Sequence, residues 1–155
     1  MEKAIFACGC FWGVESTFGK INGVITTAVG YTGGRTENPN YKEVCGGNTY
    51  HAEAVLLDFD PNVTSYEKLV NAFFKIHDPT TLNRQGPDVG SQYRSAIFYE
   101  NESQKKNAEK VKKEFEDAKF FKNKIVTQIV SAERFYFAEE YHQKYHEKMG
   151  GHCGI

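Results

Sequence analysis

The chain has 155 residues, of which 40% are hydrophobic and 25% charged, and its formal net charge is −1. These values are ordinary for one soluble globular domain, which at this length buries enough apolar surface to fold without disulfides. No basic excess points to nucleic acid, and no apolar run approaches the ~20 residues of a membrane span. Because the N-terminus has no signal-peptide pattern, we expect a cytoplasmic protein with a single domain over residues 1–155.

The chain is predicted to begin with a strand and a helix. Residues 3–8 form a short apolar run that predicts a buried strand. Residues 11–19 place Phe11, Val14 and Phe18 at helical spacing, so a short helix is expected to pack by that face.

Two strands separated by a long loop follow. Residues 24–31 are rich in β-branched side chains, and residues 52–59 form a second apolar strand. Between them, residues 32–50 are rich in Gly, Asn and Thr, which predicts a loop with room for one helical turn. A loop of this length in a compact domain is usually functional.

A second helix and a second long loop come next. Thr64 and Glu67 have the spacing of a capping box, which predicts the start of a helix. The apolar residues that share one face of this helix are Tyr66, Leu69, Val70, Phe73 and Phe74. Residues 78–92 contain Gly and Pro at several positions and are predicted to form a loop.

The last third of the chain continues the alternation. Strands are predicted at residues 93–99 and 125–130, a charged helix at 102–118, and a short helix at 138–148. The apolar residues on one face of the charged helix are Ala108, Val111, Phe115 and Ala118. The pattern predicts an α+β (α/β) two-layer sandwich, with helices packed on a mixed sheet, a ferredoxin-like core, long loops and a mobile C-terminal tail.

Four cysteines are spread unevenly along the chain, at Cys8, Cys10, Cys45 and Cys153. In a reducing compartment a permanent disulfide framework is not expected, which leaves metal binding, catalysis and plain burial. The Cys-x-Cys spacing of the first two is not that of a zinc knuckle.

Cys10 is expected between the first strand and the first helix. At a helix N-terminus the dipole and the unpaired N–H groups favour the thiolate and lower the pKa of a thiol. Gly9 and Gly13 flank the cysteine and allow a tight turn and the close approach of a ligand. The local sequence alone leaves plain burial at a strand end open.

Cys153 lies in the glycine-rich residues 150–154, beyond the last predicted helix. Glycines near a terminus make the segment mobile, so core packing explains this cysteine poorly. A resolving thiol that swings in to trap an oxidised Cys10 explains it well.

Glu53 is a candidate acid. Alternate residues of a strand share a face, so Glu53 shares its face with large apolar side chains. These are Val55, Leu57 and Phe59. If this face packs in the core, desolvation raises the pKa of Glu53 and makes it a proton donor near neutral pH. The pattern alone leaves a solvent-facing glutamate equally open.

A series of short blocks runs in order from about residue 4 to the end of the chain. The blocks are Gly9-Cys10-Phe11-Trp12-Gly13-Val14-Glu15, Gly30-Tyr31-Thr32-Gly33-Gly34, Asn38-Pro39-x-Tyr41, His51-Ala52-Glu53, His77-Asp78-Pro79, Arg84-Gln85-Gly86-x-Asp88-x-Gly90-x-Gln92-Tyr93-Arg94-Ser95 and Cys153-Gly154. At this spacing the sequence resembles the A-type peptide methionine sulfoxide reductases. Several blocks in order are more specific than any one motif.

The resemblance implies an enzyme that reduces the S epimer of methionine sulfoxide, free or in proteins, to methionine. It implies Cys10 as the nucleophile, Glu53 as the acid, and Cys153 as the resolving cysteine of an intramolecular disulfide that thioredoxin recycles. The residues with implied substrate-binding roles are Phe11 and Trp12 for the S-methyl group, Tyr41 and Tyr93 for the sulfoxide oxygen, and Asp88 as an assisting group. No metal or organic cofactor is required, and we expect a monomer.

Two features differ from the usual family pattern. Cys8 stands where the family usually has glycine, so a third thiol is expected near the site. The sequence reaches Ile155 without the further recycling cysteine that some members carry beyond this point, so we expect that cysteine to be missing.

Two other functions remain open from the residues alone. His142 and His146 are four residues apart and precede Cys153, so they could hold zinc, although charged neighbours favour a solvated helix face. A thiol peroxidase would use similar thiols, but it would not need an acid and two tyrosines around an aromatic pocket. We expect Cys45 to be a buried residue rather than a redox thiol, and His51 to be a structural hydrogen-bond partner rather than a base.

Overall fold

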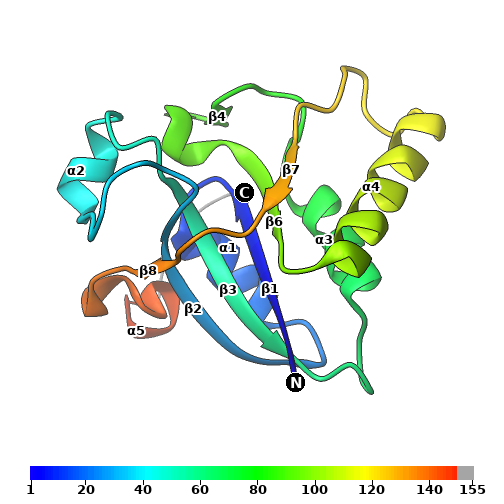
Figure 1. The fold of residues 1–155 in the computed structure, drawn as a ribbon, viewed down its shortest axis with the longest axis horizontal. Helices are drawn as coiled ribbons and strands as arrows, with labels where there is room; N and C mark the ends of the chain where they lie inside the picture. The colour runs from blue at the N-terminus through cyan, green and yellow to red at the C-terminus, as the bar shows by residue number, and fades with distance from the viewer. Residues whose placement is uncertain (150–155) are drawn as a thin grey trace.

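The computed structural model describes residues 1–149, in which a six-stranded sheet carries helices on one face (Figure 1). The strands of this sheet are β1 (Glu2–Cys8), β2 (Val24–Thr32), β3 (Ala52–Phe59), β6 (Ser95–Tyr99), β7 (Gln128–Ser131) and β8 (Tyr136–Phe137). The helices are α1 (Phe11–Gly19), α2 (Tyr41–Cys45), α3 (Tyr66–Ile76), α4 (Glu102–Asp117) and α5 (Tyr145–Met149). The short elements are the hairpin strands β4 (Arg84–Gln85) and β5 (Asp88–Val89) and the 3₁₀ turns η1 (Ser91–Tyr93) and η2 (Glu140–His142).

The sheet has the strand order β7-β6-β1-β3-β2-β8. β6 and β7 are parallel, and the other neighbouring pairs are antiparallel. Helix α1 connects β1 to β2, and α3 lies between β3 and β6, so the four central strands follow the βαββαβ path of a ferredoxin-like core. The predicted α+β fold, with helices on a mixed sheet and a ferredoxin-like core, is confirmed.

The main core lies between the sheet and the helices. The predicted apolar face of β3, which carries Val55, Leu57 and Phe59, is buried there. The predicted apolar faces of α1 and α3 are buried against it. On the other face of the sheet, small side chains such as Ala7, Ala54 and Ala96 form a thinner cluster that Ala132 and Phe135 cover. Because these side chains are small, the chain after β7 can cross this face closely.

Some predicted boundaries differ from the structure. The N-cap of α3 is Ser65, whose hydroxyl accepts from the Lys68 N–H at 3.1 Å, so the predicted cap at Thr64 is one residue early. The strand predicted from residue 93 begins at Ser95, because residues 91–93 form η1. Ala118 is exposed, since α4 ends one residue before it.

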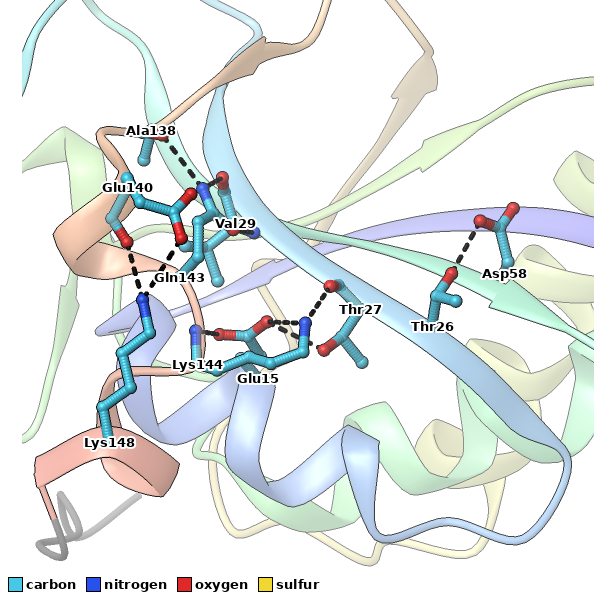
Figure 2. A network of polar contacts seen from close by, with 10 residues as sticks. All are labelled: Glu15, Thr26, Thr27, Val29, Asp58, Ala138, Glu140, Gln143, Lys144 and Lys148. Carbon is cyan, nitrogen blue, oxygen red and sulfur yellow. Dashed lines mark hydrogen bonds and ion pairs between the residues drawn. The ribbon is translucent and has the colours of Figure 1, made fainter.

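The helix predicted at residues 138–148 forms only in part, as the 3₁₀ turn η2 and the five-residue helix α5. Between these two elements the side chain of Gln143 bonds to the backbone of β2. Its side-chain amide oxygen accepts from the Val29 N–H, and its side-chain amide nitrogen donates to the Val29 carbonyl, both at 2.9 Å (Figure 2). The next residue, Lys144, has a φ of +52° and donates its backbone N–H to Glu15. The bond of the Lys144 N–H takes the place of a helical one, and together these bonds attach residues 138–149, the C-terminal arm, to β2 and α1.

None of the helices in residues 1–149 is long and apolar enough to cross a membrane. The predicted mobile tail, with Cys153, lies outside the described residues.

Candidate active site

Cys10 is the N-cap residue of α1, as predicted, and its side chain is half-buried. The turn from β1 requires the preceding glycine, because Gly9 has a φ of +109°. A Cβ on Gly9 would also lie 2.9 Å from Cγ of Gln85, in the β4–β5 hairpin. The backbone at Gly9 therefore brings Cys10 and this hairpin together at one end of the sheet.

Glu53 lies beside Cys10 and is only 1% exposed. Its Oε1 accepts from the Phe11 N–H at 3.2 Å, and its Oε2 has no hydrogen-bond partner within residues 1–149. Burial raises the pKa of Glu53 to about 8; the Phe11 bond opposes this rise, and the charge of Asp88 adds to it. The predicted core-facing carboxyl is confirmed, so a protonated acid is present at neutral pH next to the thiol.

Two tyrosines from separate segments, α2 and η1, lie near the same carboxyl. Burial raises the pKa of Tyr41, and a hydrogen bond with Cys45 and the charge of Glu53 raise it further. Burial also raises the pKa of Tyr93, as do the charges of Glu53 and of the nearby cysteines, Cys10 included. Both hydroxyls therefore keep their protons and can donate hydrogen bonds.

Asp88 reaches the site from the short β4–β5 hairpin, which the sequence predicts only as loop. It is half-buried. Its charge raises the pKa of both Glu53 and Tyr93, which places the carboxylate near these two side chains. A negative charge here favours the protonated form of Glu53.

Aromatic rings form an apolar wall next to Cys10. Phe11 is buried, with its ring centroid 5.7 Å from that of Tyr31 and 6.5 Å from that of Tyr41. Trp12 is half-buried and stacks on Tyr145 with centroids 3.8 Å apart. This wall suits a small apolar group such as an S-methyl.

The C-terminal arm supplies residues that the sequence prediction missed. His142 is fully buried, and its Nδ1 accepts from the Trp12 indole N–H at 2.9 Å. The prediction of a solvated helix face for His142 and His146 is therefore wrong. Residues 1–149 contain no group of three metal-ligating side chains.

The remaining thiols and His51 have different surroundings. Cys8 is fully buried, and desolvation raises its pKa far above the ordinary value. Cys45 is exposed, so the expectation of burial is wrong; its thiol contacts the hydroxyl of Tyr41. His51 bonds to Gly34 N and to the Thr36 carbonyl oxygen, at 3.0 and 2.7 Å, which confirms a structural role.

The structure thus gathers most of the predicted site at one end of the sheet. The residues placed there are Cys10, Phe11, Trp12, Tyr41, Glu53, Asp88 and Tyr93. Cys153 lies outside the described residues. A thiol at a helix start, a protonated acid and two hydroxyl donors around an apolar wall define a thiol enzyme that acts on a polar oxygen next to an apolar group.

Comparisons with known proteins agree with this class. The family model of peptide methionine sulfoxide reductase matches residues 2–154. A peptide methionine sulfoxide reductase of Methanosarcina acetivorans is 60% identical over 150 residues, covering 97% of this chain and 80% of that protein. The chain therefore belongs to the peptide methionine sulfoxide reductase family, and it is an oxidoreductase that reduces methionine sulfoxide.

Two solved structures of Mxr1 from Saccharomyces cerevisiae are also similar. The reduced form has a TM-score of 0.91 and 40% identity, covering 99% of this chain and 88% of that chain. Mxr1 in complex with Trx2 has a TM-score of 0.65 and 27% identity, covering 93% and 84% of the two chains.

Proposed function

We propose that the enzyme reduces the S epimer of methionine sulfoxide, free or in proteins, in a two-stage thiol reaction. Cys10 is the nucleophile, Glu53 the acid and Cys153 the resolving thiol. The whole chain acts as one catalytic domain and as a monomer. It works in the cytoplasm, where a reducing environment keeps its thiols available.

The substrate binds with its sulfoxide oxygen toward the polar side of the site. Tyr41 and Tyr93 donate hydrogen bonds to this oxygen, and the charge of Asp88 adds to the burial that keeps Glu53 protonated. The S-methyl group lies against Phe11 and Trp12. A site with hydrogen-bond donors on one side and an apolar wall on the other suits a methyl sulfoxide, because this group carries a strong hydrogen-bond acceptor directly beside an apolar methyl group.

In the first stage the Cys10 thiolate attacks the substrate sulfur while Glu53 protonates the oxygen. The attack forms a bond between the Cys10 sulfur and the substrate sulfur. The sulfur–oxygen bond of the substrate then breaks as the protonated oxygen passes to Cys10, and the sulfur–sulfur bond breaks in turn, which leaves Cys10 as a sulfenic acid. Methionine leaves, reduced by two electrons, and Cys10 is oxidised by two. The unaided oxygen is a poor leaving group, which is why the reaction needs the acid.

In the second stage the Cys153 thiol attacks the sulfenic sulfur of Cys10. Water leaves and a disulfide forms between the two cysteines. An external dithiol then reduces the disulfide by exchange and restores both thiols. The Trx2 complex of the similar protein Mxr1 supports thioredoxin as this dithiol.

The observation that carries the proposal is that Glu53 is protonated and lies next to Cys10. A carboxyl that is 1% exposed, with one oxygen unpartnered in the described residues and a pKa raised by burial to about 8, is a proton donor at neutral pH. Its other oxygen is bonded to the backbone next to Cys10, so donor and thiol are adjacent.

The experiment uses two peptides that contain one methionine sulfoxide each, as the S or the R epimer. Each is incubated with the protein and dithiothreitol and then weighed by mass spectrometry. The proposal expects the S peptide alone to lose one oxygen. Reduction of the R peptide at an equal rate would contradict the stereochemical assignment, and faster consumption of hydrogen peroxide than of either peptide would favour a peroxidase.

A further inference from the structure

Glu139 connects two parts of the site that are far apart in the sequence. Its Oε1 accepts from the Tyr31 hydroxyl at 2.9 Å, and its Oε2 accepts from the Tyr41 backbone N–H at 3.0 Å. Tyr31 is fully buried in β2, and Tyr41 is the first residue of α2. One carboxylate therefore bridges the sheet and the helix that begins at Tyr41.

The two residues that Glu139 contacts both lie close to groups that take part in the proposed reaction. Tyr31 lies directly opposite Glu53 in the pairing of β2 with β3. The ring of Tyr41 packs 6.5 Å from the rings of Phe11 and Trp12, and its hydroxyl belongs to the proposed oxygen-binding pair. The position of this hydroxyl relative to Glu53 thus depends on the bridge between the two elements.

The loop that carries Tyr41 needs such an anchor. Its helix α2 has only five residues, which is too short to be stable alone. The capping box of Asn40 and Glu43 and the bond from the Arg35 N–H to the Thr49 carbonyl all stay within the loop. The bond to Glu139, in contrast, ties the backbone of Tyr41 to a residue 98 positions away.

Glu139 itself has a rigid support in the C-terminal arm. The Ala138 N–H donates to the Val29 carbonyl at 3.0 Å, and Gln143 bonds to the same residue on β2 (Figure 2). Glu15, buried in α1, accepts from the Lys144 N–H at 2.6 Å and from the Thr27 hydroxyl at 2.8 Å (Figure 2). The arm is therefore fastened on both sides of Glu139.

The charge of Glu139 suits this role. Burial opposes ionisation, but hydrogen bonds from the Tyr41 N–H, from its own backbone N–H and from the Tyr31 hydroxyl, with the charge of His142, outweigh it and lower the pKa of Glu139. The ionised carboxylate accepts from both tyrosines at once, which a shorter or apolar side chain cannot do.

We propose that Glu139 is a positioning residue that holds the Tyr41 hydroxyl where the sulfoxide oxygen binds. It acts through the backbone of Tyr41 and does not touch the substrate. This inference rests on the proposed function, in which Tyr41 donates to the oxygen. Because that donation is worth most as charge develops on the oxygen, loss of Glu139 should lower the rate of oxygen transfer more than the affinity for substrate.

The test is a double-mutant cycle on the rate of the first stage, measured in a single turnover. Glu139→Ala should slow oxygen transfer about 10- to 100-fold, the cost of a misplaced group near an ångström off its position. Tyr41→Phe should slow it as well. In the Tyr41→Phe background, Glu139→Ala should have little further effect, because both changes remove the same interaction.

Three more variants separate positioning from general structural damage. Glu139→Gln should keep most of the rate, because its amide oxygen can accept from the Tyr41 N–H while its amide nitrogen donates to the Tyr31 oxygen. Tyr31→Phe should have a small effect, since it leaves the Tyr41 bond intact. Glu140→Ala, in the same arm but with an exposed side chain, is the matched control and should behave as the parent.

The proposal would be overturned if the rate losses of Glu139→Ala and Tyr41→Phe combined additively in the double variant. It would also be overturned if Tyr31→Phe were as slow as Glu139→Ala. If Tyr41→Phe slows the reaction and Glu139→Ala does not, the inference fails and the proposed function stands. If Tyr41→Phe matches the parent, the role of Tyr41 in the proposed function fails and the inference falls with it. Should Glu139→Ala not fold, Glu139→Asp, which is one methylene shorter, carries the same test.

Discussion

Glu53 has two properties that a surface glutamate lacks: a proton at neutral pH and a fixed position beside a thiol. The first comes from desolvation within β3, and the second from a single hydrogen bond to the backbone of Phe11. Both could be foreseen in part, because the strand pattern put Glu53 among Val55, Leu57 and Phe59. The residues that surround Glu53 come from distant loops, and no local pattern reveals them. They were predicted only from the resemblance to the family.

Other residues of the site could not be predicted. Tyr31, Glu139 and His142 make their contacts with segments about a hundred positions away. In the sequence they look like an ordinary strand tyrosine and the polar side of a helix. Such residues are recognisable only once the sheet brings the C-terminal arm next to α1 and β2.

The rate of oxygen transfer should depend on the protonation of Glu53. Its folded-state pKa of about 8 means that the acid form is present below this pH and is lost above it. The single-turnover rate should therefore fall as the pH rises through about 8. Glu53→Gln should be slower by about 10²–10⁴-fold and lack this fall. Rapid-quench measurements of methionine release across this range check both, and a Gln variant within a few-fold of the parent would show that Glu53 is not the acid.

The same burial should cost stability at high pH. The ordinary pKa of Glu53 is 4.5 and the folded value about 8, so between them the folded state holds more protons than the unfolded state. The stability that the protonated Glu53 carboxyl contributes is fully present below about pH 4.5, and it is lost as the pH rises through the folded-state pKa of about 8. Glu53→Gln should therefore gain on the parent above pH 8, by on the order of 2–4 kcal/mol, and lose this gain near pH 4.

Urea unfolding of both proteins at several pH values measures this difference. Glu140→Gln, which replaces an exposed glutamate, is the control and should show no such trend. A Glu53→Gln variant with the same advantage at pH 4 and pH 9 would contradict the burial of an acid at this position.

At the scale of whole elements, local periodicity predicted those with a long apolar pattern. α1 and β3 match their predicted bounds, and the apolar face of α3 is buried as expected. The two-residue strands β4, β5 and β8 were missed because such short segments have no period. The end of the chain was predicted as one helix because bonds from Gln143 and Lys144 to distant residues are invisible in a local pattern.

The attachment of the C-terminal arm depends on Gly30 in β2. A Cβ there would lie 2.3 Å from the Tyr136 carbonyl oxygen and 2.5 Å from the Phe135 ring. Gly30→Ala should push this segment off the sheet, lower the free energy of unfolding by about 1–3 kcal/mol, and slow the enzyme by displacing Glu139 and His142. Thermal unfolding and single-turnover rates measure the two effects.

Gly19→Ala is the matched control, because its added Cβ would meet only Thr27, at an ordinary 3.8 Å. Equal stability and activity of the two variants would mean that the close approach at Gly30 does not hold the arm.

At the scale of the molecule, the sheet order brings together groups from most of the chain. β1 and β3 are neighbours in the centre of the sheet, so Cys10 after β1 and Glu53 at the start of β3 meet at one end. The loops with Tyr41 and Tyr93 close over the same end. The alternation of strands and helices predicted this class of fold, but the meeting of the loops depends on the strand order.

The proposed resolving step separates the two stages of the reaction. Cys153→Ser should still release one methionine per enzyme, because the proposed oxygen transfer uses Cys10 and no second thiol. Turnover with thioredoxin should then fall steeply, since thioredoxin acts on a disulfide, and dithiothreitol should partly restore it by attacking the sulfenic acid. Steady-state rates with the two reductants test this, and full thioredoxin-dependent turnover of the variant would contradict the role of Cys153.

The central claim, that Cys10 takes the oxygen and Cys153 resolves it, is tested most directly by one equivalent of methionine sulfoxide without a reductant. The digested protein is then examined by mass spectrometry for its crosslinks. The account predicts one methionine released per enzyme and a disulfide between Cys10 and Cys153. A disulfide from Cys10 to Cys8 or Cys45, or methionine release by the matched Cys10→Ser variant, would contradict it.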